Sequence, residues 1–553
     1  MRKIYKTFIL LVALSFALTA CYEDLGNYNY SEINDVLIKA PEQIGVRIPR
    51  KDSVLVEVKP EISQTTEGKS DVNLRYEWKK EVAGVGAATS LIVGTERVCS
   101  VYVKSTDRSD FTLQLSVTDT EQNIVTYSET RVRLIRPYSR AWFVLQNVSD
   151  ASVLGCVDGE GQGAVVIKNV YAEEQPTGIP LKGKPIALEV NYRHRDPNIF
   201  LGFGYENIFR VITSNDGYTF DASNLKIRHS YTEMLLHKRL AGGDVNPQML
   251  SLGDEFGEYI IDNGVFWAAP ADGFDIYYPV KISEELGSYR ATNASSLRDN
   301  AIVYDAQNKR FLLYYFIPYA TNYFTQQGIR GGNYSQYDVD GRTNIQRLQS
   351  IGESADALNE FNPNNISQGG DVTYMGVSND REDPTCMALF AAGQKVSAYE
   401  FDYRGFYNPR YKRCSGYFEV DLTDTPNAGC FATSSFFNRM FFYASGNKIY
   451  RVDLSRAVPR DFLIYEHPDA GAKITHIKFR HQQYELYNFD TGWSAGIPSY
   501  LGASVEYPNG ENGMIEIKIA RRGDIDKDEN GNLMISEWAG FDKIVDFGYN
   551  YVR

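Results

Sequence analysis

Apolar and polar residues alternate in short runs along the first part of the chain. The runs at 54–58, 111–119 and 124–134 each place apolar side chains at every second position. Because neighbouring side chains of a β-strand point to opposite faces, this period of two predicts strands with one buried face. About seven such strands between residues 36 and 137 predict an Ig-like β-sandwich, with Trp78 on a central strand.

From residue 138 to 553, short strands recur in clusters. These clusters begin near Trp142, Ala187, Leu250, Ala301, Val372, Cys430 and Ile474. Their mean spacing of about 55 residues predicts an all-β fold for this part, a β-propeller of seven blades with elaborated loops. A C-terminal strand at 534–536 or 543–547 is expected to close the ring, and a helix is expected only at 231–240. A two-sheet sandwich and a series of small β domains are the alternatives.

The N-terminus has the pattern of a bacterial lipoprotein signal. Basic residues precede an apolar stretch at 7–17 that is too short to span a bilayer. Small residues end directly before Cys21, so residues 1–20 are interpreted as a signal peptide and Cys21 as the acylated first residue of the mature chain. An ordinary secretory signal with an incidental cysteine is the alternative. Residues 21–35 then form a lipidated tether.

Acidic residues follow this cysteine directly. Glu23 and Asp24 resemble the surface-export signal of lipoproteins in some Gram-negative bacteria. We therefore expect a palmitate-type lipid anchor in the outer membrane, with the protein facing the cell exterior.

The charge balance narrows the class of partner. The chain has 57 Lys and Arg residues against 70 Asp and Glu residues, a formal net charge of −13. Binding to duplex nucleic acid or to an anionic membrane surface needs clustered basic residues, so this balance argues against both. The 39 tyrosines and 45 glycines favour β structure over helix.

A family resemblance supports the first domain. The sequence Cys-Tyr-Glu-Asp-Leu-Gly-Asn-Tyr-Asn-Tyr-Ser-Glu-Ile-Asn-Asp-Val at 21–36 resembles the PKD-like family of lipoproteins. Tyr76, Trp78 and the strand that ends in Val-Thr-Asp at 117–119 are similar to the core pattern of that family. The resemblance covers the N-terminal third of the chain. It implies a PKD/Ig-like module at 36–137 and an accessory role in nutrient capture beside SusC/SusD-like TonB-dependent importers.

Residues 526–537 fit the twelve-residue calcium-loop template. The oxygen-bearing ligands would be Asp526, Asp528, Asn530, Asn532 and Glu537. Met534, at the ninth position, offers no oxygen, and the flanking residues have the pattern of strands. A β-hairpin with an Asn-Gly turn explains the same residues. Calcium is the one cofactor that the sequence suggests, and the plain hairpin is the alternative to it.

No catalytic motif stands in a suitable context. The Gly-Trp-Ser-Ala-Gly sequence at 492–496 matches the nucleophile-elbow pattern, but Pro498 follows it and no helix can start there. None of the six histidines has metal-ligand spacing. Paired acids for glycoside hydrolysis are not excluded, because their separation depends on the fold. The five cysteines after Cys21 are expected to be buried thiols, with a Cys414–Cys430 disulfide as the alternative.

Three aromatic segments that also contain amide side chains are the candidate binding elements, at 314–337, 403–411 and 484–500. Rigid rings stack on a ligand while amides form hydrogen bonds, which suits sugars and peptides. The candidate ligand-binding residues are Tyr315, Tyr319, Tyr323, Phe324, Tyr334, Tyr337 and Trp493. The alternative is that these rings pack in a core or against a neighbouring subunit.

Together these features predict a non-enzymatic outer-membrane lipoprotein. It would bind nutrient glycan or peptide, dock on a SusC/SusD-like importer, or do both. A propeller-borne glycosidase or peptidase is the first alternative, and a purely structural scaffold of the importer is the second.

Overall fold

A computed structural model describes the chain from Ile33 to Tyr551 with gaps. The described residues are 33–48, 53–66, 71–82, 89–105, 107, 110–195, 205–235, 245–251, 257–270, 277–280, 282, 286–297, 300–315, 345–348, 360–366, 371–378, 385–406, 411–480 and 499–551. The chain divides into two compact units, one up to Ile135 and one from Arg136, and each is described by itself.

The first unit is a β-sandwich. Its strands are β1 (Val36–Lys39), β2 (Gln43–Arg47), β3 (Ser53–Val58), β4 (Glu61–Gln64), β5 (Leu74–Val82), β6 (Thr89–Gly94), β7 (Cys99–Lys104), β8 (Phe111–Asp119) and β9 (Ile124–Ile135). One sheet has the order β2-β9-β8-β5-β6, and the pairs β1-β4 and β3-β7 form two smaller sheets. A short 3-10 turn, η1 (Asp71–Asn73), precedes β5.

The alternating runs form the core of this unit, as their period predicts. In β8 the apolar positions Phe111, Leu113, Leu115 and Val117 are buried. Trp78 of β5, which lies between β8 and β6, is 1% exposed, and its indole N–H donates to the carbonyl of Glu96 at 3.0 Å. A buried indole with its N–H satisfied is the arrangement that stabilises such a core.

The second unit contains seven four-stranded antiparallel sheets among its described residues. Blade 1 consists of β12 (Val165–Ile167), β11 (Ala151–Asp158), β10 (Arg140–Val148) and β37 (Lys543–Tyr551). Blade 2 consists of β13 (Pro185–Arg195), β14 (Tyr205–Thr213), β15 (Gly217–Asp221) and β16 (Ile227–Ser230). Blade 3 consists of β17 (Pro247–Ser251), β18 (Gly257–Asp262), β19 (Val265–Pro270) and β20 (Tyr278–Pro279). Blade 4 consists of β21 (Ala291–Leu297), β22 (Asn300–Asp305), β23 (Arg310–Tyr315) and β24 (Gln346–Arg347).

Blades 5 to 7 repeat the same strand order. Blade 5 consists of β25 (Tyr374–Ser378), β26 (Thr385–Ala392), β27 (Lys395–Asp402) and β28 (Cys414–Asp421). Blade 6 consists of β29 (Phe431–Ala432), β30 (Met440–Ser445), β31 (Lys448–Asp453) and β32 (Arg460–Glu466). Blade 7 consists of β33 (Lys473–Phe479), β34 (Tyr500–Glu506), β35 (Asn512–Lys518) and β36 (Ile535–Phe541). The remaining short elements are α2 (Val170–Glu174), α3 (Tyr231–Met234), η2 (Gly161–Gly163) and η7 (Tyr403–Phe406).

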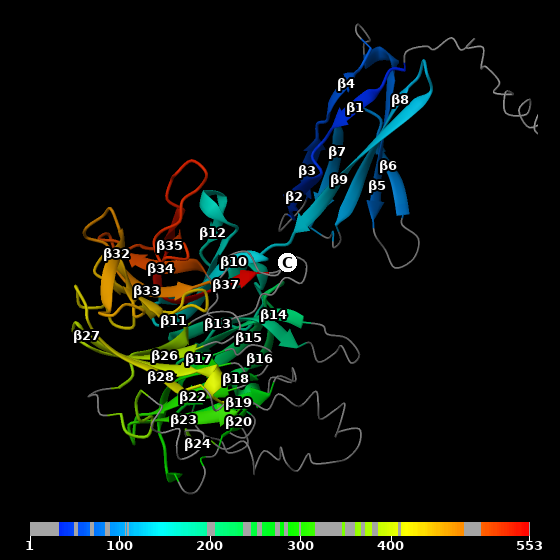
Figure 1. Ribbon diagram of the computed structural model, residues 1–553. Coiled ribbons are helices and arrows are strands. Elements are labelled where there is room, and N and C mark those ends of the chain that lie inside the picture. Colours follow the sequence, from blue (N-terminus) through cyan, green and yellow to red (C-terminus); the bar gives the residue numbers. More distant parts are fainter. Residues whose placement is uncertain are drawn as a thin grey trace, which may run out of the picture. The chain divides into compact units, whose positions relative to one another are not determined.

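The sheets form a closed ring. The strands β37, β13, β17, β21, β25, β29 and β33 each contact the next in this order, and β33 contacts β37. The C-terminal strand β37 pairs with β10 along its length, and Figure 1 shows the red β37 beside the cyan β10. Closure of a propeller by pairing of sequence-distant strands in one blade leaves no open edge at the junction. The predicted all-β fold, a sandwich followed by a seven-bladed propeller, is confirmed.

The details differ from the expectations in two places. The closing strand is β37 at 543–551, while residues 534–536 lie at the start of β36. The helix expected at 231–240 is a single turn, α3, in the described residues. No helix in the described part of the chain is long and apolar enough to cross a membrane.

Candidate binding face and hub of the propeller

The strand order of the blades places half of all loops on one face of the ring. In blade 5 the end of β25, the start of β26 and the end of β27 are register partners, at Ser378, Thr385 and Asp402. Neighbouring inner strands run in the same direction, because Tyr374 contacts Thr433 and Ser378 contacts Phe437 in blade 6. One face of the ring therefore carries the connections between the first and second strands and between the third and fourth strands of the blades. We call this face the AB face.

The three aromatic segments begin and end at this face. In blade 4, Tyr315 ends β23, and the chain returns at β24. The segment at 403–411 joins β27 to β28 in blade 5. Phe479 ends β33 before the segment at 484–500 in blade 7, and Tyr500 begins β34. The predicted ligand-binding residues Tyr319, Tyr323, Phe324, Tyr334, Tyr337 and Trp493 lie outside the described residues. The strand order therefore brings the ends of the three segments to one face, which the sequence alone did not predict.

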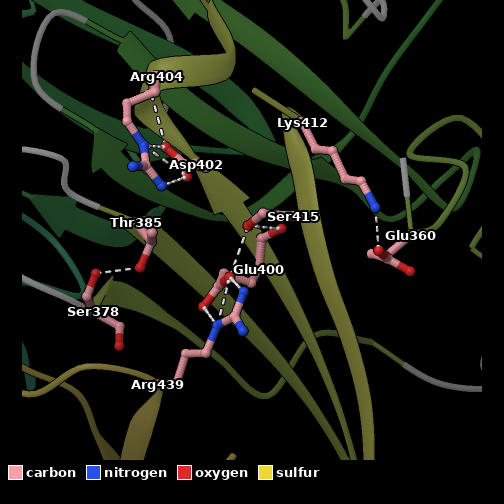
Figure 2. A network of polar contacts seen from close by, with 9 residues as sticks. All are labelled: Glu360, Ser378, Thr385, Glu400, Asp402, Arg404, Lys412, Ser415 and Arg439. Atoms are coloured by element: carbon pink, nitrogen blue, oxygen red, sulfur yellow. Dashed lines mark hydrogen bonds and ion pairs between the residues drawn. The ribbon is translucent and has the colours of Figure 1, made fainter. Parts of the chain in front are cut away.

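A described part of the segment at 403–411 presents an exposed ring. Tyr411 is 44% exposed, and the guanidinium of Arg404 lies 4.3 Å from the centre of its ring. Asp402, the last residue of β27, holds Arg404 by accepting three guanidinium hydrogen bonds, one of 2.6 Å and two of 3.1 Å (Figure 2). A guanidinium fixed in this way keeps the ring in one orientation, which lowers the entropy cost of binding a ligand on it.

An ion pair between Arg439 and Glu400 joins blade 6 to blade 5 (Figure 2). Arg439, from the connection between β29 and β30, donates to both carboxylate oxygens of Glu400 on β27, at 2.9 and 3.2 Å. Ser415 of β28 also donates to Glu400, and Lys412 pairs with Glu360 nearby. Because Glu400 is almost fully buried, a bidentate partner is needed to compensate its charge.

The junction of blades 7 and 1 is built around Arg480. Its guanidinium lies between the rings of Tyr500 and Tyr549, 3.9 and 4.0 Å from their centres, and donates twice to Glu516 at 2.7 Å. It also pairs with Glu160 of blade 1 at 3.1 Å. Burial alone would raise the pKa of Glu160, but Arg480 and Arg140 lower it below its ordinary value. The groups of this junction are fully paired, so we assign it to ring closure.

A second cluster of charged residues lies on the inner strands of blades 1, 2 and 7. We call the region formed by the inner strands the hub. Lys478 of β33 contacts Glu189 of β13 at 2.7 Å and Asp546 of β37 at 3.2 Å, and His476 contacts Asp546 at 3.0 Å. Asp546 also accepts from the backbone N–H of Leu188 at 2.8 Å. One ammonium group thus ties together the first, second and seventh blades.

The two hub carboxyl groups have pKa values shifted in opposite directions. Burial raises the pKa of Glu189. Burial would also raise that of Asp546, but Lys478 and His476 lower it to about 2. Such a divergence occurs in acid–base pairs of enzymes. Here both carboxylates contact the same ammonium group, that of Lys478.

The calcium-loop residues form a hairpin. Asp528 accepts from the backbone N–H groups of Asn530 and Asn532 at 2.9 and 2.8 Å, and Gly531 has a φ of +83° in the turn. Asp526 pairs with Lys518, and Glu537 accepts from Tyr507 and lies 3.2 Å from His467. Glu537 therefore belongs to a separate group of contacts. In the described residues, no group of three or more His, Cys, Asp or Glu side chains could hold a metal ion.

The other motifs have simple placements. The Gly-Trp-Ser-Ala-Gly sequence, His237 and His481 lie outside the described residues. His194 and His229 are in β13 and β16. The five cysteines Cys99, Cys156, Cys386, Cys414 and Cys430 are buried, and Cys430 is a free thiol, so the alternative Cys414–Cys430 disulfide is not formed.

The charged residues of the hub and of the junction were not among the residues predicted from the sequence. A usable signal exists, because Lys478, Asp546 and Glu516 each lie between two apolar residues of a strand. A charge inside a buried strand requires a partner. The sequence does not say which partner, since the paired groups lie on different strands, such as Lys478 on β33 and Glu189 on β13.

Comparisons with solved structures find low similarity over most of the chain. A quinonprotein alcohol dehydrogenase-like protein from Bacteroides thetaiotaomicron is 13% identical, with a TM-score of 0.38, over 92% of this chain and 96% of that chain. Dihydro-heme d1 dehydrogenase NirN in complex with DHE is 9% identical, with a TM-score of 0.35, over 79% of this chain and 72% of that chain. No curated protein matches the sequence.

A family model matches the N-terminal part of the chain. The match covers residues 21–185, which include the whole first unit and the strands β10 to β12 of blade 1. The resemblance inferred from the start of the mature chain is thereby confirmed at the level of the family. Residues 21–185 of this protein match the PKD-like family.

Proposed function

We propose that the protein is an outer-membrane lipoprotein, anchored through Cys21, that captures nutrient glycan or peptide on the AB face of its propeller. The observation that carries the proposal is the exposed Tyr411 ring held by Arg404, on the face where the described flanks of the other two aromatic segments also end. Exposed, oriented rings on loops of a rigid scaffold are typical of binding sites. Docking on a SusC/SusD-like importer is part of the proposal, since the resemblance of the sequence at 21–36 to lipoproteins of such uptake systems implies it.

The capture test uses soluble residues 22–553 and a panel of oligosaccharides and oligopeptides. We expect binding to one class without turnover, and loss of most of the affinity in the variants Tyr411→Ala and Tyr319→Ala. Tyr102→Ala is the matched control, because Tyr102 is 62% exposed but lies in the first unit. Equal affinity in all three variants contradicts binding at the AB face.

The anchor and the importer are tested in cells. Cys21→Ser should abolish acyl labelling and release the protein from the membrane fraction. The tagged wild-type protein should co-purify with its importer. Loss of this assembly in Tyr319→Ala, with ligand binding intact, would instead support the purely structural scaffold.

An enzyme is the second candidate, because Glu189 and Asp546 have oppositely shifted pKa values at the hub. Their shared contact with Lys478 favours a structural role. Hydrolysis of a panel member by the wild-type protein, abolished in Glu189→Gln, would establish the enzyme and overturn the capture proposal.

A further inference from the structure

Three guanidinium groups surround one aromatic ring on blade 6. Arg451, Arg456 and Arg460 lie 4.6, 4.7 and 4.8 Å from the centre of the Phe462 ring. We call these residues, together with Arg521 and Arg522 of blade 7, the arginine cluster. It is unusual in a chain with a net charge of −13.

The register of blade 6 brings the cluster together. Arg451 of β31 is the direct partner of Phe462 on β32, and Arg460 lies two positions before Phe462, so the three side chains share one face of the sheet. Arg456 lies in the connection between these strands and pairs with Asp453 at 3.0 Å. This connection belongs to the AB face.

A loop of blade 7 completes the cluster. The carbonyl oxygen of Arg522 accepts from Arg451, and Asp524 pairs with Arg451 at 3.1 Å. Between them, Gly523 has a φ of +86°, and a Cβ atom there would lie 2.6 Å from the Cδ of Arg451. Only glycine lets the backbone approach the arginine so closely. The position of Arg521 and Arg522 beside blade 6 is therefore fixed by the loop.

The charges of the cluster are only partly compensated. Asp453 and Asp524 pair with Arg456 and Arg451. Arg460 and Arg522 are both exposed, and neither forms an ion pair with a carboxylate in the part of the chain that the structure describes. The guanidinium of Arg460 thus lies beside the Phe462 ring without a carboxylate partner, and the exposed Arg522 lies on the loop whose backbone contacts Arg451.

We propose that the arginine cluster binds the carboxylate or sulfate groups of an anionic glycan. The proposal rests on the proposed capture function and names its ligand class. Guanidinium groups match planar and tetrahedral anions through paired N–H donors, and five arginines without a lysine favour such recognition over a diffuse charge effect. A polymer of repeating anionic sugars offers several such groups in a row, which multiplies weak single contacts. An anionic membrane is disfavoured, because the chain as a whole is acidic.

The test measures binding of the soluble chain to polygalacturonate, dextran sulfate and neutral dextran by calorimetry at low and high salt. We expect affinity for an anionic polymer that falls with salt. The double variant Arg460→Gln/Arg522→Gln should lose about tenfold or more, because charge-assisted hydrogen bonds are removed. The single variant Arg460→Lys keeps the positive charge but loses the paired N–H donors. It should therefore keep only part of the wild-type affinity. The control is Arg131→Gln, an exposed arginine of the first unit.

The outcomes separate the inference from the proposed function. Binding of dextran or peptides that is unchanged in the double variant retains capture and overturns the anionic ligand. Binding of polygalacturonate but not dextran sulfate, or the reverse, assigns carboxylate or sulfate. Binding only to vesicles that contain phosphatidylglycerol overturns the glycan as the occupant. No binding in any assay overturns both proposals. Because both arginines are exposed, the double variant should melt at the temperature of the wild type.

Discussion

Charged side chains inside the propeller lie where strands of different blades meet. Lys478 bridges blades 1, 2 and 7, Arg480 bridges blades 7 and 1, and Arg439 bridges blades 6 and 5. A buried ion pair often adds little net stability compared with an apolar pair, but removal of one partner is costly. These pairs therefore fix which strands meet more than they add to overall stability.

The first prediction concerns Asp546. The variant Asp546→Asn should lower the free energy of unfolding by about 3 kcal/mol, because it removes half of a buried pair and leaves Lys478 with less compensation. Equilibrium unfolding in urea measures the change. Glu189→Gln is the matched control and should cost less, since burial already disfavours the charge of Glu189. Equal stability of Asp546→Asn and wild type would contradict the structural role of the hub.

The same residue predicts a pH dependence. The folded pKa of Asp546 is lowered to about 2 from an ordinary 3.8. The stabilisation from its charge is therefore present above pH 3.8 and is lost as the pH falls toward 2. The wild-type protein should lose more stability than Asp546→Asn over this interval, measured by melting temperature at each pH.

At the level of single strands, the sequence predicts the blades where apolar residues alternate. The expected starts at Trp142, Ala187 and Ile474 fall within or beside β10, β13 and β33. The expected start at Ala301 falls in β22, because the true first strand β21 has the sequence Ala-Thr-Asn-Ala-Ser-Ser-Leu. Its small and polar residues are largely buried against neighbouring blades without an apolar pattern, so periodicity cannot reveal it.

A further stability prediction concerns the closing strand β37. Deletion of residues 543–551 should leave the edge of β10 unpaired and uncover Trp142, whose ring contacts Phe547 and Tyr549 at 5.4 and 5.2 Å. We expect a red-shifted tryptophan emission, a lower melting temperature and aggregation. A chain that ends at Tyr551 is the control and should behave as the wild type. Native emission in the deletion variant would contradict closure by β37.

The hairpin at 526–534 allows a test of backbone strain. Gly531 has a φ of +83°, and no atom would contact a Cβ at this position. Gly531→Ala should therefore cost about 1 kcal/mol through the backbone alone. In Gly163→Ala a Cβ also meets no atom and no strained φ occurs, so this control should be close to neutral. Urea unfolding distinguishes the two, and equal values would contradict the turn geometry.

The two units have separate hydrophobic cores. The core around Trp78 contains residues of the first unit alone, and the cores between the blades contain residues from Tyr138 onward. We expect residues 33–135 and 136–551, expressed separately, to melt at the two temperatures seen in the intact chain. Calorimetry measures both, and a single transition that disappears on separation would contradict independent folding.

The division into a sandwich and a ring follows from the sequence, because strand density and repeat spacing differ between the two parts. The sequence does not predict that the three aromatic segments end on one face. That placement depends on the strand order within each blade, which the periodicity of apolar residues does not reveal. The contacts of the arginine cluster likewise depend on the register between β31 and β32 and on a loop of the next blade.

Of the two strands that pair with β10, β11 follows it directly in the chain, and β37 is made last among the strands described. During synthesis, one edge of β10 stays unpaired and the apolar face around Trp142 stays uncovered until residue 551 has been added. A chain that stalls or is clipped before this point presents an open strand to proteases and chaperones, whereas a finished chain hides it. Pairing of β37 with β10 thus makes resistance to proteolysis depend on the presence of residues 543–551.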